Sequence, residues 1–140
     1  MHTPRRGWLL LALALLVPIA AYAANPHFQS GPTFTVSNDR LQTCGSLAGL
    51  GNQDVTIQVD ATVDVQCVNR GGNPPPGQRE TTSGTVTRLR PENGHLDFCV
   101  TTDTPASPCP KSMKIQTTFV NATITVSQGG QVVFRQSYQI

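Results

Sequence analysis

The chain has 140 residues, with ten Lys and Arg against eight Asp and Glu and a formal net charge of +2. This length suits one domain and is short for two. Arg5 and Arg6 lie in the N-terminal segment, and without them the acidic and basic side chains of residues 24–140 balance. No basic patch for nucleic acid and no polybasic run for anionic lipid is visible, which argues against both partners.

The N-terminal segment has the pattern of a secretory leader. Two arginines precede an apolar run over residues 8–20, and Ala21-Tyr22-Ala23 places small residues at the −3 and −1 positions of a cleavage site. The run is short for a bilayer span and contains Pro18, so the pattern favours a signal peptide (residues 1–23) over an anchor. We therefore expect residues 24–140 to form one secreted, periplasmic or extracellular domain, with no membrane insertion after cleavage.

The mature part reads as a series of short β-strands. In chain order we expect strands over residues 33–36, 41–47, 55–67, 81–89, 95–102, 113–126 and 131–140, with turns at Gly- and Asn-containing pairs such as Asn93-Gly94 and Gly129-Gly130. No stretch beyond the leader has apolar residues at helical spacing. Seven strands of this kind predict an all-β fold, an antiparallel β-sandwich that is immunoglobulin-like in broad architecture, with a closed barrel as the main alternative.

Two of these segments carry further information. Apolar side chains occupy every second position from Val55 to Cys67, which predicts one long strand with one buried face. Its length also predicts a bend or a switch between sheets partway along. In residues 113–126 the apolar positions change parity between Phe119 and Val120, which predicts a bulge or a crossing between sheets.

Four cysteines follow the expected cleavage site, at Cys44, Cys67, Cys99 and Cys109. An even count in a small exported chain is typical of two disulfides, and spacing alone leaves all three connectivities open. A metal site is the weaker interpretation, because the chain has no C-x-x-C pair and because His27 and His95 stand at no ligand-like spacing. We expect no metal and no cofactor.

Two proline-rich loops, residues 69–79 and 103–111, are the candidate binding elements. Stiff exposed loops lose little conformational entropy on binding, although the same composition is common in plain connectors. Their candidate contact residues are Asn69, Arg70, Asn73, Pro75, Arg79, Thr104, Pro108 and Lys111. If Cys99 and Cys109 paired with each other, the second loop would be a small constrained loop of the kind that enters a protease cleft.

The sequence offers no group of side chains whose types and spacing suit catalysis, and we expect no catalytic residues. Asp60 and Asp64 share a strand face, but their Cα atoms would be roughly 13 Å apart, beyond the roughly 5–9.5 Å of paired carboxylates in glycosidases. Ser46 lies in the sequence GSLAG, which misplaces the serine for a nucleophile elbow. His95 could act as a base only if the fold brought an acid and a nucleophile to it.

Four segments from Cys44 onward resemble a family of small secreted bacterial proteins common in actinobacteria. They are residues 45–52 (GSLAGLGN), residues 67–78 with the pattern C-x-N-x-G-G-N-x-x-P-G-Q, Cys109-Pro110, and residues 122–130, which contain ATITV and QGG. The family has no known activity, so the resemblance implies secretion and a β fold alone. It also implies that Cys67 pairs with Cys109, because family members keep cysteines at these places, and that Cys44 and Cys99 form a second bridge.

These observations lead to one expectation about function and two alternatives. We expect a secreted, non-enzymatic binding or structural protein that uses the two loops to contact an extracellular protein or glycan. The first alternative is a secreted inhibitor of a protease or other hydrolase that acts through residues 103–111. The second is a small extracellular enzyme.

Overall fold

The computed structural model describes residues 25–71, 77–107 and 109–140. The expected signal peptide and the candidate residues Asn73, Pro75 and Pro108 lie outside this part. Seven strands run through the described residues: β1 (His27–Ser37), β2 (Arg40–Ala48), β3 (Val55–Val68), β4 (Gln78–Leu89), β5 (Leu96–Thr101), β6 (Lys114–Gln128) and β7 (Gln131–Gln139). None of the described residues belongs to a helix long and apolar enough to span a bilayer.

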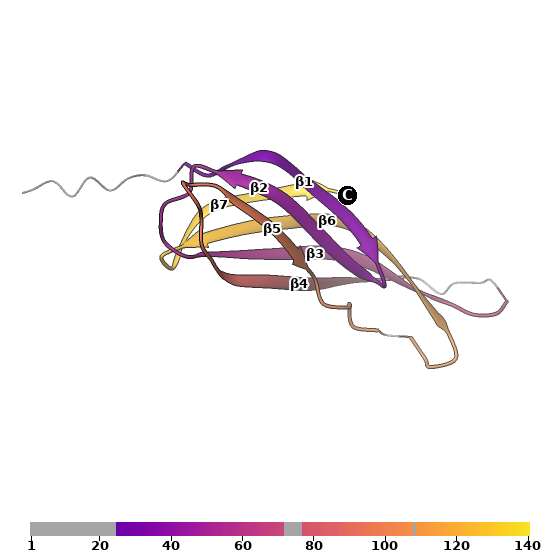
Figure 1. Cartoon of the computed structure of the whole chain (residues 1–140). Helices are drawn as coiled ribbons and strands as arrows, with labels where there is room; N and C mark the ends of the chain where they lie inside the picture. The colour runs from indigo at the N-terminus through magenta and orange to yellow at the C-terminus, as the bar shows by residue number, and fades with distance from the viewer. Residues whose placement is uncertain (1–24, 72–76, 108) are drawn as a thin grey trace, which may run out of the picture.

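The strands form two antiparallel sheets that lie face to face (Figure 1). One sheet has the order β1-β2-β5 and the other the order β4-β3-β6-β7. The predicted seven-stranded sandwich is therefore confirmed, and no strand ladder joins the two sheets within the described residues as a closed barrel would require. The fourth strand pairs with the third here, whereas in an immunoglobulin constant domain it joins the sheet of the first, second and fifth.

The alternating pattern of β3 builds the centre of the core. Its inward side chains from Val55 to Val65 are all buried, and β4 and β6 flank it on either side. The strand stays in one sheet from the pair Val55–Gln128 to the pair Val68–Lys114, so the switch between sheets suggested by its length does not occur. Its central position favours a long strand, because neighbours on both edges pair with its backbone from Val55 to Val65.

The parity change in β6 is a bulge. Thr62 of β3 pairs with Asn121 and the next residue, Val63, pairs with Phe119, so Val120 is the extra residue. A bulge shifts the alternation by one position, which lets both Phe119 and Ala122 face the core. One of the two expectations for this segment is therefore confirmed, and the crossing between sheets is not observed.

Strand β1 begins six residues earlier than expected. Its pairing with β2 has register shifts between Phe28 and Ser30 and between Ser30 and Thr33, around a cis Gly31–Pro32 bond. These irregularities interrupt the alternation of side chains, and for this reason the first half of the strand has no period-two pattern in the sequence.

Two disulfides join the four cysteines, as the family resemblance implies. Cys44 and Cys99 stand directly opposite each other in β2 and β5, with Cα atoms 4.1 Å apart. Cys67 and Cys109 join the end of β3 to the segment between β5 and β6, with Cα atoms 5.4 Å apart. The first bridge links neighbouring strands, whereas the second holds a connecting segment at one end of the sandwich.

Candidate functional site

The second disulfide brings the two candidate loops to the same end of the sandwich. Figure 1 shows the described parts of the β3–β4 connection and of the β5–β6 connection extending beyond the sheets at this end. We call the described part of this region, residues 67–71, 77–78 and 109–114, the disulfide-linked end. The opposite end carries the β2–β3, β4–β5 and β6–β7 connections.

Strand β3 extends past its neighbour β4 at this end. Pairing with β4 stops at Val65 and Gln78, whereas pairing with β6 continues to Val68 and Lys114. The result is a two-stranded overhang in which Val68 and Lys114 are direct neighbours.

Short turns follow each strand of the overhang. The N–H of Gly71 donates to Oδ1 of Asn69 at 3.0 Å, and the N–H of Met113 donates to the carbonyl oxygen of Pro110 at 2.9 Å. A side-chain oxygen that accepts from the backbone two residues on fixes a turn without help from a neighbouring strand. Both turns therefore have a defined course next to the Cys67–Cys109 bridge.

Between these turns lies a cleft of about 330 Å³, lined by Val68, Asn69, Arg70, Ser112 and Lys114. This volume is at the lower end of the range for small-molecule sites. The lining combines two cations, an amide, a hydroxyl and one apolar side chain. Such a set can donate several hydrogen bonds to a polar ligand and can balance a negative charge on it.

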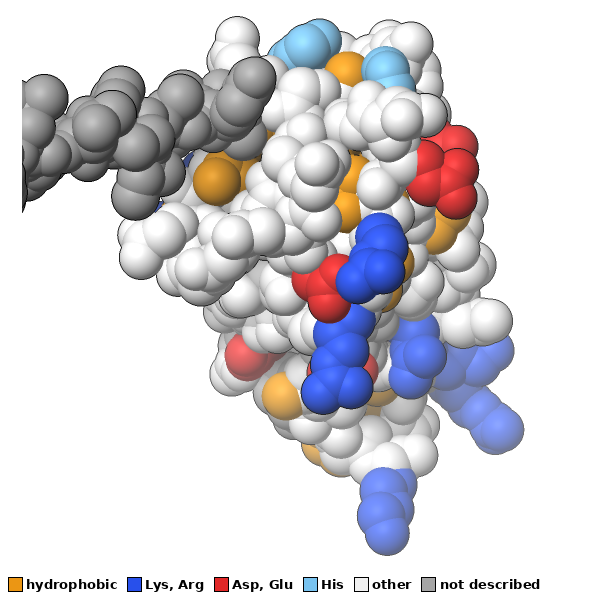
Figure 2. Space-filling view, turned by 60° about the vertical axis from the view of Figure 1, so that its left-hand side comes forward, with side chains coloured by type: hydrophobic (Ala, Val, Ile, Leu, Met, Phe, Trp, Pro, Cys, Tyr) orange, Lys and Arg blue, Asp and Glu red, His pale blue; other side chains and the backbone are white. Residues whose placement is uncertain are grey.

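The two cations that line the cleft, Arg70 and Lys114, form no ion pair within the described chain, so the cleft keeps their positive charge. Ion pairs in the described chain join Arg79 to Asp64 and Arg90 to Asp54. Neither of them involves Arg70 or Lys114, nor Lys111 in the adjacent turn. On the face drawn in Figure 2, which brings the opposite end of the sandwich forward, Lys and Arg side chains lie over the middle and lower part, some beside acidic side chains, and the histidines lie at the top.

Two of the residues expected to bind a partner are engaged elsewhere. The Arg79 guanidinium donates to both carboxylate oxygens of Asp64 across the β3–β4 ladder, at 2.8 and 3.2 Å. These hydrogen bonds lower the pKa of Asp64 and raise that of Arg79. Thr104 lies at the far end of the second loop, where its Oγ1 accepts from Nε of Arg40 at 3.2 Å.

The described part of the second loop is anchored at both of its ends. At its start, Asp103 donates its N–H to the carbonyl oxygen of Ser83, and its own carbonyl oxygen accepts from Oγ1 of Thr82. At its other end, Cys109 is bonded to Cys67. A small loop closed by Cys99 and Cys109, the condition stated for an inhibitory loop, is not formed.

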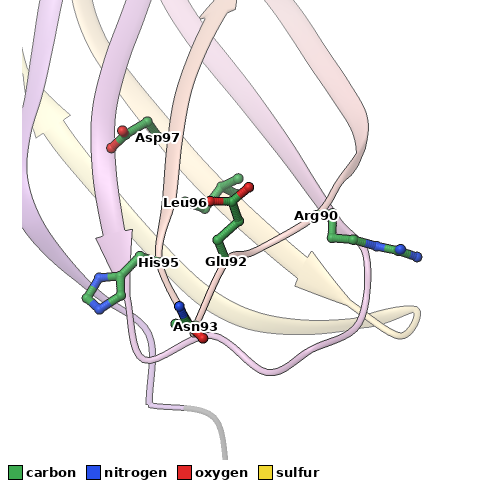
Figure 3. A pocket seen from close by; sticks show the side chains of 6 residues that line it. All are labelled: Arg90, Glu92, Asn93, His95, Leu96 and Asp97. Atoms are coloured by element: carbon green, nitrogen blue, oxygen red, sulfur yellow. The ribbon is translucent and has the colours of Figure 1, made fainter.

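A second cavity, of about 410 Å³, lies at the β4–β5 connection and is lined by Arg90, Glu92, Asn93, His95, Leu96 and Asp97 (Figure 3). The side chains of His95, Glu92 and Arg90 point in different directions there. Nδ1 of His95 lies 3.1 Å from Oε1 of Gln29, within hydrogen-bonding distance. Among the described residues, no carboxylate is hydrogen-bonded to the His95 side chain.

Metal ligands are also not brought together. The described residues contain no group of three or more His, Cys, Asp or Glu side chains that could hold an ion. All four cysteines are oxidised, which removes their thiolates from consideration as ligands.

The sequence identified Asn69 and Arg70 as candidates but missed three residues of the cleft, Val68, Ser112 and Lys114. Val68 and Lys114 are 46 positions apart and become neighbours through the β3–β6 register. The pairing of Cys67 with Cys109, which the resemblance implied, was the one available indication that the two regions lie together.

Comparisons of this chain with models of protein families, with curated proteins and with solved structures find no match. The function is therefore inferred from the geometry of the disulfide-linked end.

Proposed function

We propose that this protein is a secreted, non-enzymatic binding module that holds an acidic glycan in the cleft of the disulfide-linked end. The observation that carries the proposal is the placement of Arg70 and Lys114, which form no ion pair in the described chain, beside the hydroxyl group of Ser112. A glycan offers many hydroxyl groups, which hydroxyl and cationic side chains can bind. A carboxylate or sulfate on the sugar would be bound by the two cations.

Rigidity of the cleft supports this role. The Cys67–Cys109 bridge and the two hydrogen-bonded turns restrict the lining residues before a ligand arrives. Less conformational freedom is then lost on binding, which improves affinity for a given set of contacts. The two disulfides also suit an oxidising compartment outside the cytoplasm, in agreement with the proposed secretion.

Charge argues for local recognition of the ligand. Residues 24–140 carry equal numbers of acidic and basic side chains, so there is little long-range attraction of a polyanion. Binding should depend on Arg70 and Lys114 themselves, and other cations of the surface should matter little. This expectation separates a specific site from non-specific adsorption.

The experiment measures binding of the mature chain to polygalacturonate, a carboxylated polysaccharide, with neutral dextran as the reference. We expect binding to polygalacturonate that weakens as salt is raised and falls at least about tenfold in the double variant Arg70→Gln/Lys114→Gln. The matched control is Arg88→Gln/Arg90→Gln, which removes the same charge from exposed positions outside the cleft and should bind as the unaltered chain does.

Three results would argue against the proposal. Equal losses in both double variants would mean non-specific attraction. Equal affinities for dextran and for polygalacturonate would mean that the carboxylate of the glycan is not recognised. Failure to bind sulfated and carboxylated glycans, together with capture of an acidic protein that depends on Arg70 and Lys114, would replace the glycan by a protein partner.

The two alternatives stay predictions of lower support. Inhibition by residues 103–111 can be tested with a panel of proteases, and no described contact favours it. An enzymatic role would require groups around His95 that the described cavity does not bring into hydrogen-bonding distance of it.

A further inference from the structure

The two sheets have four edge strands, which are not equally protected. They are β1 and β5 in one sheet and β4 and β7 in the other. An exposed edge presents unpaired N–H and C=O groups to other chains, and proteins guard edges with prolines, bulges, charges, short strands or covering segments. A comparison of the four strands shows which edge is open to pairing.

Three edges carry such protection. Strand β1 contains Pro32 and two register shifts. Strand β5 has six residues, with Asp97 among them. Strand β4 is covered near its middle, where Asp103 donates its N–H to the carbonyl oxygen of Ser83 and Gly84 lies against Thr101.

Strand β7 has less of this protection, and its one register shift lies near its start, between Val132 and Phe134. It contains no proline and one charged residue, Arg135. Six consecutive pairs, from Phe134–Val126 to Gln139–Asn121, follow one another without a register shift. This half of the strand is a regular edge, open on the side away from β6.

The direction of its free backbone groups follows from one hydrogen bond. The N–H of Ile140 donates to the carbonyl oxygen of Val120 at 3.1 Å, so Ile140 faces β6. Because residues of an antiparallel strand alternate between the two sides, Arg135, Ser137 and Gln139 direct their N–H and C=O groups away from β6. No backbone hydrogen bond in the described chain joins these groups to β1.

Apolar side chains are exposed along the same flank. Val36 in β1, Val132 in β7 and the C-terminal Ile140 are 49%, 60% and 43% exposed. Among the described residues, Ile115 is the one other large hydrophobic side chain with comparable exposure. Figure 1 shows β1, β7 and the C-terminus on one side of the molecule, so the open edge and the exposed apolar groups coincide.

The space between β1 and β7 is filled by aromatic rings and not by a strand. Phe28 packs against Phe134 and Tyr138, with ring centroids 5.5 and 6.2 Å apart, and Phe34 packs against Tyr138 at 5.6 Å. All four rings are part-buried. Burial also raises the pKa of Tyr138. We call this region, with Val36, Val132 and Ile140, the β1/β7 flank.

We propose that two copies of this chain pair through their β7 strands, antiparallel and about a two-fold axis at Gln136, to form one continuous eight-stranded sheet. This register places Phe134 opposite Tyr138 of the second copy, within the part of β7 that has no register shift. Arg135 then faces a neutral residue, Ser137 of the second copy. A two-fold axis at Arg135 would instead put two like charges directly opposite each other, which destabilises a strand pair.

The flank suits a second copy because it is complementary to itself. Each copy brings the same apolar and aromatic side chains, and the pairing covers them on both molecules. Outward backbone groups of Arg135 and Ser137 satisfy those of Ser137 and Arg135 in the other copy. Residues 24–140 have no net charge, so repulsion between whole molecules does not oppose the association. The inference is independent of the ligand proposed for the cleft.

The first test is the mass of the mature chain in solution, measured by analytical ultracentrifugation over a concentration series. We expect a monomer–dimer equilibrium whose dissociation constant rises by about tenfold or more in Val132→Lys/Ile140→Lys, because lysine on an edge opposes strand pairing. The control is Ile115→Lys, the same change at an exposed apolar residue away from the flank, which should leave the equilibrium unchanged.

The second test locates the axis. In the proposed register the two Gln136 residues form a non-hydrogen-bonded pair with Cα atoms about 4.5 Å apart, a separation that a disulfide can bridge. Gln136→Cys should therefore give a covalent dimer under oxidising conditions, and Thr85→Cys, on the outer face of the other edge strand, should not.

A chain that stays monomeric at every concentration overturns the proposal. So does a dimer whose dissociation constant is unchanged in Val132→Lys/Ile140→Lys. A dimer in which Gln136→Cys forms no more cross-link than Thr85→Cys overturns the β7 pairing. A monomer that binds an extended peptide of another protein along β7 would replace the second copy by a different partner.

Discussion

Gly84 in β4 lies directly against the backbone of Thr101 in β5, although the two strands belong to different sheets. A Cβ atom on Gly84 would come within 2.7 Å of the carbonyl carbon of Thr101 and 2.9 Å of Cα of Thr102. The sandwich is therefore closed on this side by backbone contact, whereas the β1/β7 side is filled by aromatic rings. The two sides differ because one strand offers no side chain at the point of contact.

Replacing this glycine should separate the sheets locally. We expect Gly84→Ala to lower the free energy of unfolding by roughly 2 kcal/mol or more, because backbone atoms cannot move aside as a flexible side chain would. Denaturant unfolding measures the change. The control is Gly71→Ala, where the added Cβ would have an ordinary contact at 3.5 Å. Equal unfolding midpoints for the two variants would contradict the prediction.

Two buried threonines should respond in opposite ways to the same substitution. Thr43 is fully buried, and its hydroxyl has no hydrogen-bond partner among the described residues. The Thr102 hydroxyl accepts from the N–H of Leu41 at 3.1 Å. We expect Thr43→Val to raise the free energy of unfolding by about 1 kcal/mol, and Thr102→Val to lower it by roughly 1–3 kcal/mol because it leaves a buried donor unpaired. A stabilised Thr102→Val variant would contradict this account.

Loss of the bridge that defines the cleft should be costly to stability. Cys67 and Cys109 are 42 positions apart, and in the chain-entropy model a closed loop of this size contributes about 4 kcal/mol. This is comparable to the whole stability of a small domain. We expect Cys67→Ala/Cys109→Ala to melt far below the unaltered chain in a calorimetric scan. An unchanged melting temperature would mean that strand pairing alone holds the disulfide-linked end.

The ion pair between Asp64 and Arg79 should be detectable when the Asp64 carboxyl group is titrated with acid. Hydrogen bonds from Arg79, with a smaller contribution from its charge, hold the pKa of Asp64 below its ordinary value despite slight desolvation. A carboxyl group whose pKa is depressed on folding stabilises the fold above its unfolded-state pKa of about 3.9 and loses that contribution as the pH falls through the folded value. NMR titration of the Asp64 carboxyl should show its pKa rising towards the ordinary value in Arg79→Gln. Identical titration curves would refute the pairing in solution.

Much of the fold follows from local pattern. Alternation from Val55 to Val65 determines a strand with one buried face, and the parity change at Phe119–Val120 marks the position of a bulge. Both are properties of a single strand, since they depend on which side of the backbone each apolar side chain occupies. The first half of β1 escaped prediction because its bulges around Gly31 and Pro32 remove that alternation.

The candidate site could be predicted only in part for the same reason. Asn69 and Arg70 are visible in the sequence as polar residues of a stiff loop. No short segment of the sequence indicates that Lys114 lies beside Val68 or that Arg79 forms an ion pair with Asp64. These relationships depend on which strands become neighbours and in what register.

The sequence by itself determined the strands apart from the first half of β1, their buried faces, the change of parity in β6 and the even number of cysteines. The tertiary structure decided that β4 joins β3 and not β5, that the two loops meet in a cleft, and that β7 is left as an open edge. The physical reason is that hydrophobic alternation specifies which face of a strand is buried. The choice of neighbour instead depends on packing between residues that are distant in the chain, and no single segment contains that information.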